Sequence, residues 1–199
     1  MTQSGGVPRY VEHLKSGYKR SRRPKEPLKK RMYMLDTARK YLKLELSVLP
    51  ADKQQKRPVV GGWKEYQHRL PTETEVNAWF SNSQSGVCVI CGKVSGNLEV
   101  IDFDNSGELF DAWKEQLPDE LFGKLVIERT PSGGYHAVYR CVDEVSGNIK
   151  LAQRKTDKLQ TLIETRGEGG LFLCAPTDGY EFIGKGFGGL CVLSGDERL

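Results

Sequence analysis

The chain has 199 residues, of which 38% are hydrophobic and 28% are charged, as expected for one soluble domain or one domain with a small appendage. No apolar run approaches the ~20 residues of a membrane-spanning helix, and the first residues lack the apolar core of a secretory signal. The five scattered cysteines argue against a disulfide scaffold and for a reducing compartment, so we expect a cytoplasmic protein that does not associate with membranes.

The net charge of +4 is unevenly distributed. Residues 9–31 carry ten basic and two acidic residues, or +8, and the rest of the chain carries 20 basic and 24 acidic residues, or −4. The segment is rich in proline and lacks apolar periodicity, so we expect residues 1–31 to form a flexible arm. A basic arm suits a polyanion such as DNA, and its candidate DNA-binding residues are Lys19, Arg20, Arg22, Arg23, Lys25, Lys29, Lys30 and Arg31.

From Met32 onward, apolar residues recur at three- and four-residue spacing. The pattern predicts a helix over 33–45, a strand over 46–50 and a polar loop over 51–62. Thr72 followed by Glu75 has the spacing of a capping box, which predicts a second helix there.

The second half alternates strands with helices and then continues as consecutive strands. The predicted strands are 86–91, 98–102, 124–129, 135–141, 159–164, 170–174 and 180–183, with a helix over 106–116. This order predicts an α+β fold with a largely antiparallel sheet.

Asp102 and Asp104 lie two residues apart at the end of the apolar strand 98–102, so their side chains share one face. Two adjacent carboxylates repel each other unless they are exposed or hold a cation such as Mg²⁺ or Mn²⁺ between them. In the alternative interpretation, the strand ends here and Asp104 caps the following helix.

The segment Thr130–Tyr139 predicts a tight turn between two strands. Gly133 and Gly134 permit close backbone turns, the turn could direct amide groups at a phosphate, and His136 follows early on the next strand. The alternative is an ordinary hairpin with a half-exposed histidine.

Glu164 ends another apolar strand and could supply a third carboxylate, with Arg166 two residues further along. The planar guanidinium group suits a phosphate. The alternative is a surface Glu–Arg pair beside a glycine loop.

Cys88 and Cys91 have the spacing of zinc ligands, but they lie in a predicted buried strand without a second Cys/His pair. Alternation places them on opposite faces, and we expect no zinc.

Taken in order, the segments I-D-F-D, T-P-S-G-G-Y-H and I-E-T-R-G-E-G-G-L-F-L-C-A-P-T resemble the primase-polymerase (prim-pol) domain of the archaeo-eukaryotic primase superfamily, in the form found in mobile-element, phage and plasmid replication proteins. The resemblance covers about residues 33–190. It implies a catalytic domain over 32–199, with an N-terminal α/β unit over about 32–97 packed beside an RRM-like antiparallel catalytic sheet over about 98–190.

The resemblance also implies roles for individual residues. Asp102, Asp104 and Glu164 match the metal-binding acids, although the third acid is often Asp in the family, and His136 matches a catalytic histidine that contacts nucleotide phosphates. Further nucleotide contacts are implied for Ser132, Gly133, Gly134, Arg166 and Lys56.

The implied activity is template-directed nucleotidyl transfer, as DNA polymerase and primase, with two Mg²⁺ or Mn²⁺ ions. The implied partners are template DNA, primer, dNTP or NTP, and a helicase or accessory priming domain. The alternatives are a non-catalytic nucleotide- or nucleic-acid-binding module of a replication initiator and a metal-dependent nuclease.

Overall fold

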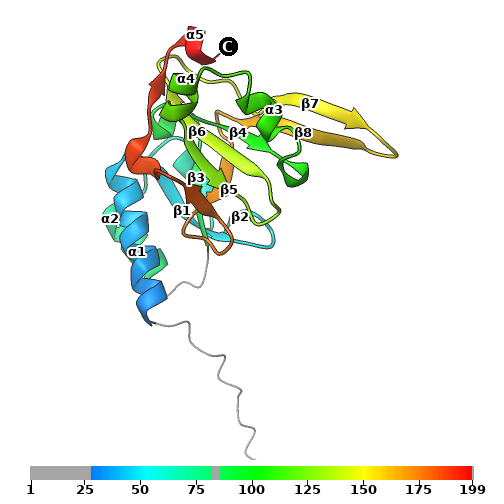
Figure 1. Cartoon of the computed structure of the whole chain (residues 1–199). Helices are drawn as coiled ribbons and strands as arrows, with labels where there is room; N and C mark the ends of the chain where they lie inside the picture. Colours follow the sequence, from blue (N-terminus) through cyan, green and yellow to red (C-terminus); the bar gives the residue numbers. More distant parts are fainter. Residues whose placement is uncertain (1–27, 82–85, 199) are drawn as a thin grey trace, which may run out of the picture.

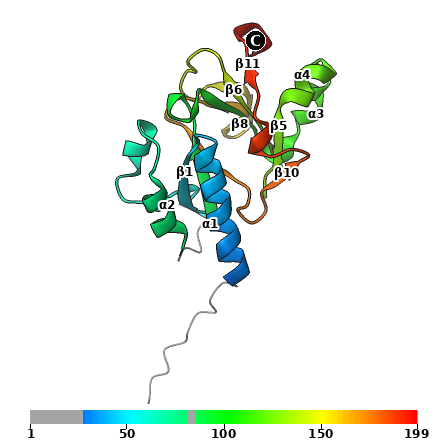
Figure 2. The same cartoon turned by 90° about the vertical axis from the view of Figure 1, so that its left-hand side faces the viewer.

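The fold is α+β, as the order of elements predicts. A computed structural model of the chain describes residues 28–81 and 86–198. They form two β-sheets with helices at the flanks, as Figures 1 and 2 show from two directions. All strand pairs are antiparallel except one short parallel pair between β11 and β6.

The smaller sheet has four strands in the order β2-β1-β3-β9. Its strands are β1 (Ser47–Asp52), β2 (Arg57–Pro58), β3 (Gly86–Ile90) and β9 (Leu171–Cys174). Strand β9 comes from late in the chain and pairs with β3, with Val89 opposite Phe172. The smaller sheet is therefore completed by a strand from the other end of the domain.

The larger sheet has the order β10-β5-β6-β4-β8-β7, and β11 pairs with β6 beyond the end of β5. Its strands are β4 (Leu98–Phe103), β5 (Val126–Arg129), β6 (Tyr135–Cys141), β7 (Lys150–Lys155), β8 (Leu159–Arg166), β10 (Glu181–Ile183) and β11 (Val192–Leu193). Strands β7 and β8 form a hairpin that projects from the body of the molecule (Figure 1).

The helices lie on different sides of the two sheets (Figure 2). The α-helices are α1 (Leu28–Lys43), α2 (Glu73–Phe80), α3 (Phe110–Lys114), α4 (Asp119–Lys124) and α5 (Gly195–Arg198), and the 3₁₀ turns are η1 (Trp63–Gln67), η2 (Lys93–Ser95), η3 (Asn105–Gly107) and η4 (Phe187–Gly189). The capping box predicted for α2 is confirmed, because the side chains and backbone N–H groups of Thr72 and Glu75 bond reciprocally.

The two faces of the larger sheet have different neighbours. Val100 and Val138 on one face belong to a buried cluster that also contains Val89 of the smaller sheet, together with residues of α1 and α2. Phe103 and Ala137 on the other face pack with Phe110, Trp113 and other residues of α3 and α4. The face toward the smaller sheet is the one on which the candidate site lies.

Some predicted boundaries were wrong. The helix predicted over 33–45 is α1, at Leu28–Lys43, so Lys29, Lys30 and Arg31 are helical rather than part of a flexible arm. The Nζ atom of Lys30 lies 2.6 Å from Asp178, a tertiary contact that local periodicity does not reveal. Strands β2, β7 and β11 and helices α4 and α5 were not predicted, and β2 (Arg57–Pro58) lies within the predicted loop over 51–62. Short or largely exposed elements lack an apolar pattern.

Within the described parts of the chain, no helix combines the length and the apolar character that a membrane span requires.

Candidate active site

A row of polar and charged residues crosses the larger sheet. Strand pairing places Asp102 of β4 opposite His136 of β6 on one side and opposite Glu164 of β8 on the other. The same register continues outward to Glu128 of β5 and Lys150 of β7. Directly opposed residues of neighbouring strands point to the same face, so these five side chains form one line, which we call the polar row.

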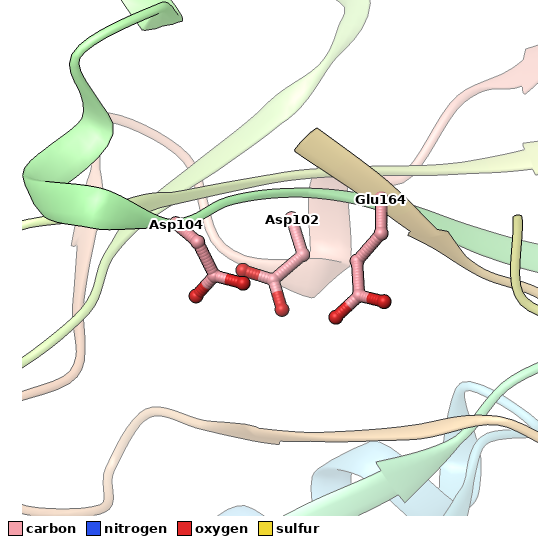
Figure 3. A group of neighbouring side chains, drawn as sticks. All are labelled: Asp102, Asp104 and Glu164. Atoms are coloured by element: carbon pink, nitrogen blue, oxygen red, sulfur yellow. The ribbon is translucent and has the colours of Figure 1, made fainter. Parts of the chain in front are cut away.

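Three carboxyl groups converge at this row. One carboxylate oxygen from each of Asp102, Asp104 and Glu164 lies within 4.8 Å of the others, and Figure 3 shows the three groups pointing to the same side of the strands. Asp104 stands at the start of η3, but its side chain makes no capping hydrogen bond. The structure therefore favours the cation-binding interpretation of Asp104 over the helix cap.

Arg166 neutralises part of this negative charge. Its Nη2 atom lies 3.1 Å from Oδ2 of Asp102 and 2.5 Å from Oε1 of Glu164. Burial raises the pKa of Asp104, and the neighbouring Asp102 carboxylate raises it further. Burial also raises the pKa of Glu164, while Arg166 opposes the shift. A bound divalent cation would stabilise the ionised forms of Asp104 and Glu164.

His136 is held by a residue that our sequence analysis missed. Glu128 is fully buried, its Oε2 lies 2.8 Å from Nδ1 of His136, and its Oε1 accepts a hydrogen bond from the backbone N–H of Ala175 at 2.6 Å. Since a carboxylate accepts hydrogen bonds, the Nδ1–H group donates to Glu128, and Nε2 faces Asp102 at 3.6 Å. A charged residue at the inward position of the apolar strand Val126–Glu128 was the available sequence signal.

The predicted turn between β5 and β6 is confirmed. The N–H of Thr130 donates to the carbonyl of Gly134 at 2.9 Å, and the N–H of Gly133 donates to Thr130 at 3.0 Å. Gly133 has a φ of +82°, and any side chain at Gly134 would collide with the carbonyl oxygen of Phe103. The two glycines therefore allow the turn to close against the end of β4.

A cavity of about 330 Å³ opens beside the carboxylates. Lys56, Ser132, His136 and Arg166, four of the predicted nucleotide contacts, line it together with Asp102 and Asp104. Gly133 and Gly134 are not among its lining residues. The lining residues that sequence reasoning missed include Thr130, Asn148 and Tyr180. The cavity thus combines carboxylates, cations and hydroxyl groups, which is the chemistry that a metal-bound phosphate ester requires.

Five of the predicted DNA-binding residues lie outside the described part of the chain: Lys19, Arg20, Arg22, Arg23 and Lys25. Cys88 and Cys91 are both buried, and they belong to different hydrophobic clusters on opposite faces of the smaller sheet. Alternation along the strand also predicts opposite faces for these two cysteines, and for that reason we did not interpret them as a pair of zinc ligands.

The family model described as "Prim-Pol: Bifunctional DNA primase/polymerase, N-terminal" matches residues 38–186, a range that includes the acidic cluster and the cavity-lining residues named above. A comparison with curated proteins found no similar sequence.

Proposed function

The chain belongs to the Prim-Pol family of bifunctional DNA primase/polymerase N-terminal domains, and from this premise we propose that it catalyses template-directed nucleotidyl transfer as a DNA polymerase and primase. The observation that supports this most directly is the cluster of Asp102, Asp104 and Glu164, whose oxygens lie within 4.8 Å of one another beside the cavity. The proposed substrates are template DNA, a primer, and dNTP or NTP.

The three carboxylates would hold Mg²⁺ or Mn²⁺, and we propose two ions. When bound, such ions lower the pKa of an attacking 3′-hydroxyl group and neutralise a departing pyrophosphate. Asp102 lies at the centre of the cluster, opposite both His136 and Glu164, so it is the residue placed to serve both ions. Asp104 and Glu164 flank it.

Residues on both sides of the acids are assigned to the triphosphate, with His136 and Ser132 on the β6 side and Arg166 on β8. In the imidazolium form, His136 donates Nδ1–H to Glu128 and presents Nε2–H at the cavity to a phosphate oxygen. Ser132 and Lys56 line the same cavity and provide a hydroxyl donor and a positive charge. Arg166 pairs with two carboxylates, and its guanidinium group would be available for a phosphate if the acids held cations.

The glycines of the turn act on this site through the backbone. Gly133 and Gly134 allow the turn to fold tightly against β4, and this brings Ser132 to the cavity. We propose that they position the nucleotide-binding groups. A helicase or accessory priming domain is the proposed protein partner, and the cytoplasm is the proposed location.

Primer extension tests this function. The wild-type chain, a primed template, labelled dNTPs and Mn²⁺ should give elongated products, whereas Asp102→Ala with Asp104→Ala should give none. A matched control, Asp111→Ala with Asp143→Ala, removes two exposed acids that lie outside the cavity lining and should retain activity.

Other outcomes identify other functions. Cleavage of the labelled DNA, lost in the same double variant, would indicate a nuclease. Nucleotide or DNA binding without any product would indicate a non-catalytic module. Extension by the double variant at the wild-type rate would show that the acids have been assigned incorrectly.

A further inference from the structure

The β7–β8 hairpin continues the polar row beyond the acids. Lys150 of β7 is directly opposite Glu164 of β8. The hairpin projects from the body of the molecule (Figure 1). Its outer strand, β7, is exposed along nearly its whole length. The exposed edge strand of the larger sheet therefore lies directly beside the acidic cluster.

The basic residues of the hairpin are not evenly distributed between its two faces. Arg154 pairs in register with Gln160, which shares a face with Glu164 because the two are four residues apart in one strand. Lys158 lies in the bend between the two strands, where its carbonyl accepts a hydrogen bond from the N–H of Thr156. Lys150 and Arg154 thus line the face that carries the acids, and Lys158 stands at the tip of the hairpin. We call the surface formed by these three residues the basic hairpin face.

Lys155 lies on the opposite face, since it pairs with Leu159. Among the described residues, a nearby acid neutralises one of the three positive charges of the basic hairpin face. Glu108 lies 2.9 Å from Arg154 and pairs with it, and Asp157 stands at the tip. The two lysines of the face, Lys150 and Lys158, are exposed.

In-line displacement at a two-metal site places the attacking and leaving groups on opposite sides of the reacting phosphorus. His136 and Ser132, assigned to the triphosphate, lie on the β6 side of Asp102. Arg166, the further phosphate contact, lies on β8, where it pairs with Asp102 and Glu164. The basic hairpin face lies beyond Glu164, on β7. The strand that delivers the 3′-hydroxyl group therefore approaches over β8 and β7. From Lys150 to Arg154 the strand rises about 13 Å at ~3.3 Å per residue, which equals about four nucleotides of one strand at ~3.4 Å each.

We propose that the basic hairpin face binds the sugar-phosphate backbone of the primer strand and guides its 3′ end to the acidic cluster. The proposal rests on the nucleotidyl-transfer function proposed above. Lys and Arg on phosphates carry no sequence information, so the contact is independent of primer sequence.

The test compares two doubly neutralised variants of the full chain. Lys150→Gln with Lys158→Gln removes two charges from the basic hairpin face. Lys155→Gln with Lys40→Gln removes two exposed charges elsewhere and is the matched control. Affinity for primed and for unprimed template is measured at several salt concentrations in EDTA, so that the readout is independent of metal and of chemistry.

Each lost phosphate contact flattens the plot of log affinity against log salt by about 0.7 to 0.9. We expect the Lys150/Lys158 variant to flatten the slope for primed DNA by about 1.5 and to bind unprimed template as the control does. The proposal is overturned by equal slopes for the two variants, or by an equal loss on both DNAs. If the wild-type chain binds primed DNA with these slopes but does not extend the primer, the result contradicts the proposed nucleotidyl transfer and not the primer contact.

Discussion

The Nη2 atom of Arg166 lies 2.5 Å from Oε1 of Glu164, its neighbour but one on β8, and 3.1 Å from Oδ2 of Asp102 on β4. One guanidinium group therefore occupies the space between two of the three carboxylates that would hold a metal ion. It stabilises the metal-free site, and it competes with any divalent cation that enters.

Arg166→Gln is expected to raise the affinity for Mn²⁺ in the absence of nucleotide, because a competing positive charge is removed from the acids. The same change should lower nucleotide affinity by about tenfold or more, since a charge-assisted phosphate contact is lost. A titration with Mn²⁺ tests the expected rise in metal affinity, and a separate binding measurement tests the expected fall in nucleotide affinity. Arg129→Gln, at an exposed position of the same sheet, is the control, and a fall in Mn²⁺ affinity in Arg166→Gln would refute the competition.

Removing Asp104 should stabilise the metal-free protein at neutral pH. Burial and Asp102 raise the folded-state pKa of Asp104, so ionisation costs more in the folded than in the unfolded state. The stabilisation of the folded protein by the protonated Asp104 carboxyl group is complete below the ordinary pKa of 3.8. It is lost as the pH rises through the raised folded-state pKa. In EDTA at pH 7, Asp104→Asn should therefore unfold at a higher temperature than wild type.

The pH and metal dependence of this effect provide its controls. The difference in unfolding temperature should shrink as the pH falls toward 3.8, where the wild-type carboxyl group is also neutral. Adding Mn²⁺ should stabilise wild type more than Asp104→Asn. A variant that is less stable than wild type in EDTA at pH 7 would show that the carboxylates are not crowded in the metal-free state.

His136→Ala should separate nucleotide binding from metal binding. Loss of one charge-assisted hydrogen bond to a phosphate is worth about 1.5–3 kcal/mol, or roughly ten- to a hundredfold in nucleotide affinity. Because His136 is not one of the three clustered acids, Mn²⁺ affinity should change much less. Fluorescence titration with a labelled nucleotide, beside Mn²⁺ titration, measures both. Unchanged nucleotide affinity and transfer rate would return His136 to a purely structural role.

The basic arm should contribute to DNA affinity without affecting nucleotide binding. Since Lys30 in α1 contacts Asp178, the deletion should end at residue 27 rather than at 31. It removes seven basic residues, and if four of them contact phosphates of a single strand, the slope of log affinity against log salt should flatten by about 3. Titration of single-stranded and primed DNA at several salt concentrations checks this. Identical slopes for the two chains would mean that the arm does not bind DNA.

Much of the site could be predicted from sequence because its main signals are local. Alternation along β4 places Asp102 and Asp104 on one face whatever the strand pairs with, and the glycines of the Thr130–Gly134 turn require a tight hairpin. The capping box at Thr72 likewise depends on residues only three positions apart. For these features, the spacing of a few residues along the chain is enough to predict the local arrangement.

The remaining features depend on which distant segments pair, and only the tertiary structure decided them. Register between four neighbouring strands brings Glu128, His136, Asp102 and Glu164 into one row, although the first and last are 36 residues apart in the chain. The pairing of β9 with β3 and the contact of Lys30 with Asp178 are of the same kind. Glu128 can be buried because both of its carboxyl oxygens have hydrogen-bond partners, His136 and the N–H of Ala175. A buried polar group acquires such partners only when the chain has folded.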